Sequence, residues 1–394
     1  MEKQKLLIAV HQMNMGGVQK SLLCALRALD YDRYDVTLYV RKNRCELLNQ
    51  ADPRVSRIIV NDDKTRYYRK PRAVLLFLLY RITELLHFNY LPSKRKLEKY
   101  VTDRQMQYEK KHWFSDGTTY DIAVSYIQGP TAQFVEKYIP AKKKIVFFHG
   151  STDESHALHE TIFPQFDKIV AVNSCCRDVL RSLYPTVAER IDYIENYVDA
   201  AAVREEAKAY EIGRKEKPIV LCTCGRFTPV KGFDLAVEAA KLLKKRGFDF
   251  IWYFVGDGEQ RAAIETQINN VGLSDKIHIT GILKNPYPYY AGCDIYVQPS
   301  REESYGLSIK EAQILCRPVV TTATVGGKSL VQDGETGLIA PISAEGIAEK
   351  IAALIEDEAL CAHIKNVLKQ KDDTAEADAY RKAWAKLLSE QETA

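Results

Sequence analysis

The chain has 394 residues, of which 46% are hydrophobic and 27% are charged, with a formal net charge of +4. This length favours two domains of about 150–200 residues over a single core, and the mild positive charge does not by itself indicate a nucleic-acid partner. No apolar run reaches the ~20 residues that a transmembrane helix needs. The nine cysteines lack paired metal-ligand spacing, and the N-terminus leads directly into a strand-like run, so we expect reduced thiols in a cytoplasmic protein.

The first half of the chain alternates short apolar runs with helical or loop segments. The first run predicts a buried parallel strand and leads to Gly16 and Gly17 before an amphipathic pattern. The strand-like runs are Leu6–Val10, Val36–Val40, Val55–Val60, Ile122–Tyr126, Lys144–Phe148 and Ile169–Val172. This alternation predicts βαβ units and a parallel sheet. The glycine pair lets a ligand approach the backbone, although it lacks the dinucleotide fingerprint and a plain tight turn is the alternative.

Residues 64–118 interrupt this alternation. The part from 64 to 111 holds 13 Lys and Arg residues against four acidic residues, a net charge of +9. Within it, the apolar run Ala73–Tyr80 is too short to cross a bilayer but suits a face that lies in the headgroup layer between basic flanks. The segment is interpreted either as a contact with an anionic membrane surface or acceptor, or as a core helix with a solvated basic loop.

A histidine, His149, follows the strand predicted at Lys144–Phe148. Ligands bind open parallel sheets at the carboxyl ends of the strands, so this position suits a binding role. A structural histidine at a strand end is the alternative. His156 and His159 follow on a predicted helix, and we assign them no metal role because their spacing is not i, i+4.

A change of composition divides the chain near residues 196–217, where a charged stretch leads to Pro218. The run that follows predicts a strand ending at Gly225, and Arg226 and Lys231 come after it, before a helix that starts near Asp234. An arginine fork and a lysine ammonium together suit a phosphate. Two solvent-exposed cations are the alternative reading.

Two glutamates follow the next predicted strand, Cys293–Gln298. The apolar pattern from Leu307 to Leu315 predicts an amphipathic helix that opens at Gly306, and such an N-terminus offers backbone N–H groups to a phosphate. Glu303 lies in the loop before the helix, whereas Glu311 lies inside it, about 7 Å along the axis from Gly306. The arrangement suits a diphosphate between two hydroxyl-bearing sugars, and two solvated glutamates are the alternative.

These segments resemble the family 4 retaining glycosyltransferases. The signature of that family is matched by Pro299-Ser300, Glu303, Glu311 and Pro318-Val319-Val320, and the resemblance extends to Gly225-Arg226, Lys231-Gly232, 194–199 and 334–339. The chain departs from the family at Ser304-Tyr305-Gly306, where Gly-Phe-Gly is usual, and at Cys316, where glycine is usual. The first departure concerns the flexibility of the loop, and the second concerns packing at the end of the helix.

The resemblance implies an α/β protein of the GT-B class, with two Rossmann-like domains facing a central cleft. The N-terminal acceptor-side domain would span 1–195 and contain the insert 64–118. A hinge at 196–217 would lead to the nucleotide-sugar-binding domain, 218–374. Residues 375–394 would form a closing helix that packs back on the first domain.

The resemblance also implies a role for each candidate site residue. The catalytic set would be Glu303 on the sugar hydroxyls, His149 on the far side of the sugar, and Arg226 and Lys231 on the diphosphate. Glu311 would bind the ribose hydroxyls, and Leu283 would lie beside the base. The full donor-binding set would be Gly16, Gly17, Arg226, Lys231, Leu283, Tyr305, Gly306, Leu307 and Glu311. No metal ligand and no cofactor are expected, because the nucleotide-sugar is a substrate.

The expected activity is retaining transfer of a hexose from a nucleotide-sugar, with UDP as the first candidate nucleotide. The acceptor would be a hydroxyl of a glycan, a lipid-linked sugar or a polymer in bacterial cell-surface polysaccharide synthesis. We expect a cytoplasmic protein, peripheral at the inner membrane face through 64–111, with no nucleic-acid partner. The alternatives are an epimerase or hydrolase of the same fold, which would need a further acid/base pair, and a non-catalytic nucleotide-sugar-binding subunit, which would more readily have lost Glu303, Arg226 or Lys231.

Overall fold

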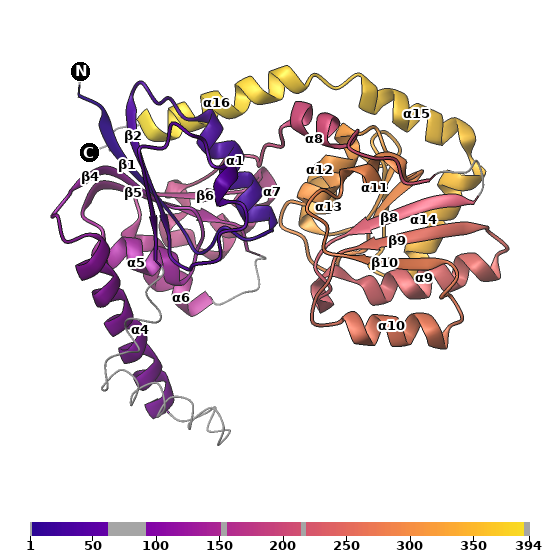
Figure 1. Cartoon of the computed structure of the whole chain (residues 1–394), viewed down its shortest axis with the longest axis horizontal. Helices are drawn as coiled ribbons and strands as arrows, with labels where there is room; N and C mark the ends of the chain where they lie inside the picture. Colours follow the sequence, from indigo (N-terminus) through magenta and orange to yellow (C-terminus); the bar gives the residue numbers. More distant parts are fainter. Residues whose placement is uncertain (1, 62–91, 151–155, 214–217, 390–394) are drawn as a thin grey trace. The chain divides into compact units, whose positions relative to one another are not determined.

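The computed structural model describes residues 2–61, 92–150, 156–213 and 218–389 (Figure 1). The chain divides into two compact units, and each unit is built on one parallel β-sheet. Unit 1 comprises Met1–Ala171, Leu180–Ile194 and Arg381–Ala394. Unit 2 comprises Val172–Val179 and Glu195–Tyr380.

The sheet of unit 1 has seven parallel strands in the order β3-β2-β1-β4-β5-β6-β7. Its strands are β1 (Gln4–Val10), β2 (Tyr34–Val40), β3 (Arg57–Val60), β4 (Tyr120–Ser125), β5 (Ala141–Phe148), β6 (Lys168–Ala171) and β7 (Ile191–Tyr193). The six strands predicted for this half are confirmed, and β7, of only three residues, was not predicted. The strand predicted from Val55 begins two residues later, because the N–H of Val55 donates to the carbonyl of Asp52 in a turn.

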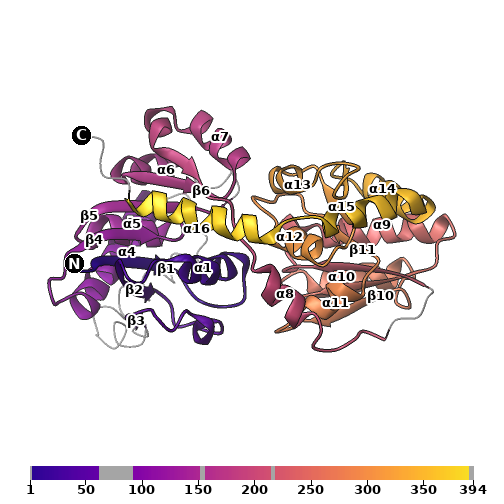
Figure 2. The ribbon, with the colours of Figure 1, turned by 90° about the horizontal axis from the view of Figure 1, so that it is seen from above.

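Helices separate these strands, as expected for βαβ units. The helices of unit 1 are α1 (Gly17–Ala28), α4 (Pro92–Trp113), α5 (Pro130–Tyr138) and α6 (His156–Ile162), with short 3₁₀ turns at η1 (Leu48–Gln50), η2 (Phe163–Gln165) and η3 (Pro185–Arg190). Helix α1 buries Leu22, Leu23 and Leu26 on one face, the i, i+1, i+4 spacing of an amphipathic helix. Two further helices, α7 (Ser174–Leu183) and α16 (Asp373–Ser389), contribute residues to both units (Figure 2).

The basic insert is described only in part. The apolar run Ala73–Tyr80 and the side chains of residues 92–99 lie outside the described residues. The last turns of α4 pack into unit 1: Met106 is buried, and Glu109 forms an ion pair of 2.9 Å with the buried Arg41 and accepts a hydrogen bond of 3.1 Å from Tyr39. The helical end of the insert therefore belongs to the core of unit 1, whereas both interpretations of the apolar run and its basic flanks stay predictions.

The sheet of unit 2 has six parallel strands in the order β10-β9-β8-β11-β12-β13. They are β8 (Ile219–Cys224), β9 (Phe250–Val255), β10 (Ile277–Gly281), β11 (Ile295–Gln298), β12 (Val319–Thr322) and β13 (Leu338–Ala340). Every strand predicted for this half is confirmed. The chain moves from β8 through β9 to β10 on one side and then crosses to β11 on the other, so β8 and β11 are neighbours at the point where the strand order reverses.

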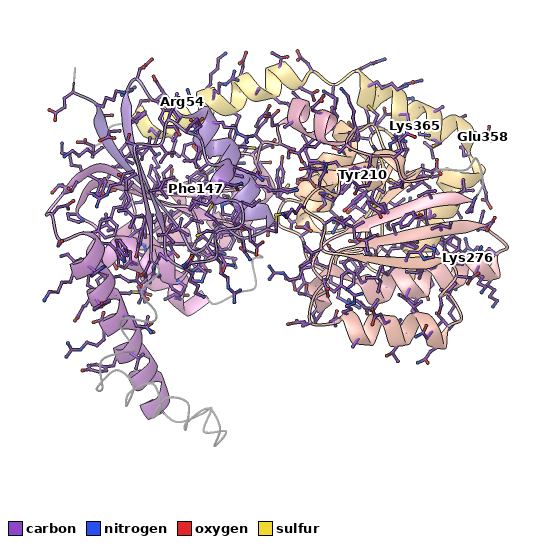
Figure 3. All side chains as sticks on the ribbon, viewed as in Figure 1. Arg54, Phe147, Tyr210, Lys276, Glu358 and Lys365 are labelled. Carbon is purple, nitrogen blue, oxygen red and sulfur yellow. The ribbon has the colours of Figure 1, made fainter. Side chains whose placement is uncertain are left out.

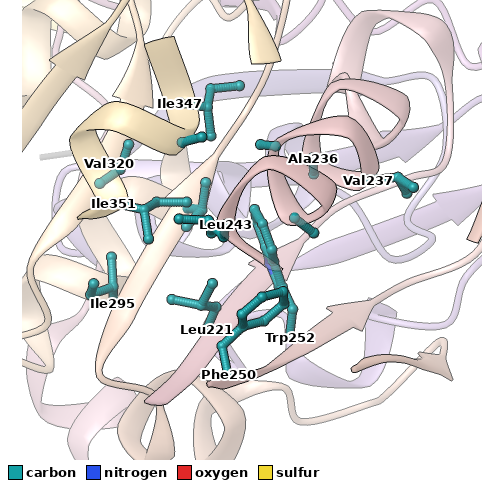
Figure 4. Close-up of a cluster of buried hydrophobic side chains, with 14 of the residues drawn as sticks. Leu221, Ala236, Val237, Leu243, Phe250, Trp252, Ile295, Val320, Ile347 and Ile351 are labelled. Atoms are coloured by element: carbon teal, nitrogen blue, oxygen red, sulfur yellow. The ribbon is translucent and has the colours of Figure 1, made fainter. Parts of the chain in front are cut away.

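Helices cover both faces of this sheet and bury two separate clusters. The helices are α8 (Ala200–Glu206), α9 (Phe233–Lys245), α10 (Arg261–Asn270), α11 (Tyr287–Gly292), α12 (Leu307–Ile314), α13 (Val325–Leu330), α14 (Ala344–Glu356) and α15 (Glu358–Lys369), with a 3₁₀ turn, η4 (Pro229–Lys231). Leu221 and Trp252 pack with α9 and α14 (Figure 4), whereas Cys222 packs with α11 and α12. Adjacent residues of β8 therefore serve opposite faces, as the period of two in a strand requires.

The helix predicted over Leu307–Leu315 is confirmed as α12 and ends in a Schellman motif. The N–H of Cys316 donates to the carbonyl of Gln313 at 2.9 Å, and the N–H of Arg317 donates to that of Ala312 at 3.0 Å. This motif needs a left-handed residue, and Cys316 has φ +55°. Within the described parts of the chain, no other non-glycine residue has a positive φ.

Replacing this cysteine by glycine is expected to stabilise the protein. The left-handed conformation costs an L-residue about 1–2 kcal/mol, which glycine avoids. Glycine loses more backbone entropy on folding, which offsets about 0.5–1 kcal/mol of this gain. We therefore expect Cys316→Gly to raise the free energy of unfolding by about 0.5 kcal/mol, measured by urea unfolding. Cys316→Ala, which keeps the strain, is the control. A Cys316→Gly protein less stable than Cys316→Ala would contradict this account.

Candidate active site

The loops that follow β8 and β11 lie together at the carboxyl edge of the unit 2 sheet. The N–H of Arg301 donates to the carbonyl of Val230 at 2.7 Å. The guanidinium of Arg301 donates to the carbonyl of Pro229 at 2.8 Å and forms an ion pair of 2.6 Å with Asp234. Open α/β sheets bind ligands at the position where the strand order reverses, and these loops occupy that position.

Gly232 allows the two loops to approach at backbone distance. It has φ +66°, and a Cβ built at this position would lie 2.0 Å from the carbonyl oxygen of Pro299. No side chain fits there, because backbone atoms cannot move aside as the end of a side chain can. This approach places Lys231 beside Glu303, with 2.6 Å between Nζ and Oε2.

We expect Gly232→Ala to destabilise unit 2 strongly. Overpacking costs about 1–3 kcal/mol and the left-handed conformation about 1–2 kcal/mol, so the total loss should be about 2–5 kcal/mol. Gly247→Ala is the matched control, because Gly247 also has a positive φ, +85°, but a Cβ there meets nothing within 4 Å. Urea unfolding measures both variants. If both substitutions lowered the free energy of unfolding equally, the close approach to Pro299 would add nothing to the cost of a side chain at Gly232.

A chain of hydrogen bonds between buried polar side chains holds Glu303 in position. Its Oε2 also accepts a long hydrogen bond of 3.4 Å from the hydroxyl of Ser300. Ser300 in turn accepts from Nε2 of Gln298 at 2.9 Å, and the hydroxyl of Tyr296 donates to Oε1 of Gln298 at 2.8 Å. Tyr296, Gln298 and Ser300 are buried. Because these contacts order the loop, the carboxylate is held in place before any ligand arrives.

Arg226 differs from Lys231 in its surroundings. It is exposed, and among the described residues it forms no ion pair. It follows Gly225, and the N–H of the next residue, Phe227, donates to the carbonyl of Asp257 at 3.0 Å. The backbone that carries Arg226 is therefore fixed, while its guanidinium is available to an anion.

The loop from Glu303 to Gly306 is held by contacts from distant parts of the sequence. The carbonyl of Ser304 accepts from Nδ2 of Asn173 at 2.6 Å, and the N–H of Gly326 donates to the carbonyl of Glu303 at 2.7 Å. Tyr305 is buried, and burial raises the pKa of its hydroxyl. The central aromatic residue of Ser304-Tyr305-Gly306 thus packs inside unit 2.

Sequence reasoning did not identify Asn173 or Gly326 as part of this site. The pair Gly326-Gly327 lies in the first turn of α13, a few residues after β12, and could have been noticed. A Cβ at Gly326 would lie 2.5 Å from the carbonyl oxygen of Tyr305, so a glycine is needed. Asn173 gave no local signal, because its contact with Ser304 spans 131 residues.

Helix α12 carries two predicted features of the site, its own N-terminus and the second glutamate, Glu311. Gly306 has φ +94° and precedes Leu307, the first residue of α12. Glu311 is buried, and its Oε1 accepts a hydrogen bond of 3.0 Å from the hydroxyl of Tyr287. Leu283, which follows β10, is half-buried and packs against the cluster that contains Tyr287.

The remaining predicted residues lie in unit 1. Gly16 and Gly17 connect β1 to α1, and Gly16 has an extended φ of 177°. His149 follows β5, where its N–H donates to Oε1 of Gln128 at 3.0 Å. Gly16, Gly17 and His149 therefore all follow the carboxyl ends of strands, as predicted.

The ring of His149 lies among aromatic side chains. Ring centroids are 5.0 Å apart for His149 and Tyr126 and 6.2 Å apart for His149 and Phe147. Phe147, labelled inside unit 1 in Figure 3, stacks on Trp384 of α16 at 5.1 Å. Lys143 also reaches α16, where Nζ donates to the carbonyl of Leu387 at 2.7 Å. Because burial disfavours the charged imidazolium, it lowers the pKa of His149 to about 3.

This shift predicts a pH dependence of stability. In the unfolded chain His149 has an ordinary pKa, so between pH ~6.5 and ~3 the unfolded state binds the additional proton. The free energy of unfolding should therefore fall as pH decreases through that window. We expect His149→Phe to show a shallower decrease than the wild type in urea unfolding from pH 7 to pH 4, while His278→Asn, at an exposed position, keeps the wild-type slope. Identical slopes for wild type and His149→Phe would contradict a neutral buried imidazole.

A known protein family matches a part of the chain that lies in unit 2. Residues 204–371 match the family described as "Glycosyl transferases group 1". The alpha-D-kanosaminyltransferase of Streptomyces kanamyceticus is 30% identical over 201 residues, which are 49% of this chain and 52% of the relative. The lipopolysaccharide core biosynthesis glycosyltransferase LpsE of Rhizobium meliloti is 30% identical over 186 residues, 45% of this chain and 53% of the relative. The chain thus spans about half the length of the curated relatives it matches.

Solved structures match nearly the whole chain. Anabaena HepE in complex with UDP and glucose has a TM-score of 0.69 at 16% identity and covers 98% of this chain and 100% of that one. Sucrose-phosphate synthase from Thermosynechococcus elongatus has a TM-score of 0.71 at 17% identity, with the same coverage. The fold is GT-B. The predicted fold class is therefore confirmed.

None of the helices in the described ranges is long and apolar enough to cross a bilayer. Within the same ranges no group of three or more His, Cys, Asp or Glu side chains is arranged to hold a metal ion.

Proposed function

We propose that the protein is a retaining glycosyltransferase that uses a nucleotide-sugar donor, with UDP as the nucleotide. The observation that carries this proposal is the pairing of Lys231 with Glu303 at the strand-order reversal of a GT-B unit. This pairing puts a cation and a carboxylate 2.6 Å apart, on loops that also carry the exposed Arg226 and lead into α12. A nucleotide-sugar presents the complementary groups, because its anionic diphosphate is joined directly to a sugar with free hydroxyls.

The diphosphate would bind to positive groups of unit 2. Arg226 is available to it, Lys231 can exchange its contact with Glu303 for a phosphate oxygen, and the first N–H groups of α12 are not used within the helix. Negative charge grows on the leaving diphosphate during transfer, so these groups would stabilise the transition state more than the ground state. They supply the positive charge from the protein itself, which supports a transfer that does not require a divalent metal.

The carboxylates would bind the two sugars. Once Lys231 turns to the phosphate, Glu303 is left to accept hydrogen bonds from the transferred sugar near its developing positive charge. Glu311, inside α12, would accept from the ribose hydroxyls, and Leu283 would contact the base. His149 would contact the transferred sugar as a neutral imidazole, because its lowered pKa keeps it uncharged near pH 7.

The acceptor would be a hydroxyl of a glycan, a lipid-linked sugar or a polymer. This part of the proposal rests on relatives whose names refer to lipopolysaccharide core and capsular polysaccharide biosynthesis. Reactions of that kind take place at a membrane surface, and the +9 charge of residues 64–111 suits an anionic one. We accordingly propose a cytoplasmic protein that is peripheral at the inner face of the membrane.

Removing either cation should abolish most of the activity. Wild-type protein is incubated with UDP-sugars and lipid-linked acceptors, and NMR of the product reports the anomeric configuration. Arg226→Ala and Lys231→Ala should each lose about 2–4 kcal/mol of transition-state stabilisation, a decrease in kcat/KM of roughly 30- to 1,000-fold.

Arg246→Ala is the control for these variants, because Arg246 is also an exposed cation of unit 2 but lies at the end of α9. It should transfer sugar at the wild-type rate. Wild-type rates from both Arg226→Ala and Lys231→Ala would show that the diphosphate site is elsewhere. A product of inverted configuration would refute retention while leaving the donor site in place.

A further inference from the structure

The carboxylate of Glu311 is buried in the described structure and has a neutral donor for a partner. Only 3% of the residue is exposed, and Oε1 accepts a hydrogen bond of 3.0 Å from the hydroxyl of Tyr287, itself 7% exposed. A buried carboxylate is costly unless hydrogen-bond donors compensate for the water it has lost. Tyr287 supplies such a donor from a different helix, α11.

The direction of this hydrogen bond is determined by chemistry. An ionised carboxylate only accepts, and a phenol has a single O–H, so the proton of Tyr287 points at Oε1 of Glu311. This contact restricts rotation of the carboxylate about its last side-chain bond.

Tyr287 is itself anchored by its neighbours. Its N–H donates to Oδ1 of Asn285 at 3.1 Å, and Nδ2 of Asn285 donates to the carbonyl of Glu206 at the end of α8 at 2.7 Å. Its ring packs against Tyr290, with 6.0 Å between the centroids. The hydroxyl that contacts Glu311 is therefore carried by a side chain with little freedom to move.

We propose that Tyr287 is a positioning residue that orients the carboxylate of Glu311 toward the vicinal hydroxyls of the donor's ribose, and that it thereby selects ribonucleotides over 2′-deoxyribonucleotides. This inference rests on the proposed function, in which Glu311 binds the ribose. Two vicinal hydroxyls donate well only to a carboxylate with a defined orientation. When that orientation is lost, the 2′-hydroxyl contributes less to binding, and a donor that lacks it is disfavoured less.

The test compares binding of ribo- and deoxyribonucleotides. Titration calorimetry first measures UDP, GDP and ADP, and the nucleotide that binds most tightly is then compared with its 2′-deoxy counterpart. We expect the wild type to prefer the ribonucleotide by about 10- to 100-fold, the effect of a hydrogen bond to a charged group. Tyr287→Phe should reduce this preference by about 2- to 10-fold, because a carboxylate without this donor accepts from the 2′-hydroxyl in a poorer geometry.

Two variants separate positioning from a general loss of structure. Tyr289→Phe makes the same substitution two residues along α11, where the ring packs against Tyr253 at 5.1 Å, and it should keep the wild-type preference. In a Glu311→Ala background, where there is no carboxylate to orient, adding Tyr287→Phe should cause no further change in the preference. A purely structural effect of Tyr287 would weaken both nucleotides equally and leave their ratio unchanged.

The outcomes distinguish this inference from the function on which it rests. A loss of preference in both Glu311→Ala and Tyr287→Phe supports the inference. A loss in Glu311→Ala with a wild-type ratio in Tyr287→Phe overturns the role of Tyr287 and keeps Glu311 on the ribose. A wild-type ratio in both variants, or no binding of any of the three nucleotides, overturns the ribose assignment of Glu311 and the inference with it.

Discussion

The backbone contact between Gly232 and Pro299 is the constraint on which the candidate site depends. Strands β8 and β11 are neighbours, but their loops could diverge, because the chain leaves them in opposite directions. The missing side chain at Gly232 allows the loops to touch, and Arg301 then bonds across them. Lys231 and Glu303 lie 72 residues apart in sequence and form an ion pair only because this approach exists.

Hydrogen bonds from buried polar side chains hold the groups that would bind the donor. Glu303 is backed by Ser300 and Gln298, and Glu311 is backed by Tyr287. Such networks are favourable only when every member has a partner, and they then fix side-chain orientation. This arrangement suits a site that must bind hydroxyl groups, since a hydroxyl is recognised by the direction of an acceptor as much as by its charge.

Burial among aromatic neighbours lowers the pKa of His149, so its imidazole is neutral near pH 7. A neutral imidazole suits a sugar hydroxyl, because one ring nitrogen donates and the other accepts. In the proposed function, positive charge for the diphosphate would come instead from Arg226 and Lys231.

The amino-acid sequence by itself determined the strands, their α/β alternation and the loops that carry the site. Apolar runs are local patterns, and in a parallel sheet every strand places its following loop at the same edge. The sequence therefore predicted that Arg226, Lys231, Glu303 and Gly306 would lie at the carboxyl ends of strands. It also identified Cys316 as a departure from glycine, although not as a strained residue.

Only the tertiary structure decided which of these groups touch. The pairing of Lys231 with Glu303 needed the strand order of the sheet, which is not a local property of the sequence. Asn173 and Tyr287 were not predicted, because each acts through one hydrogen bond to a residue that is distant in the chain. Such contacts leave no periodic pattern, since they depend on the packing of elements rather than on the spacing of residues within one element.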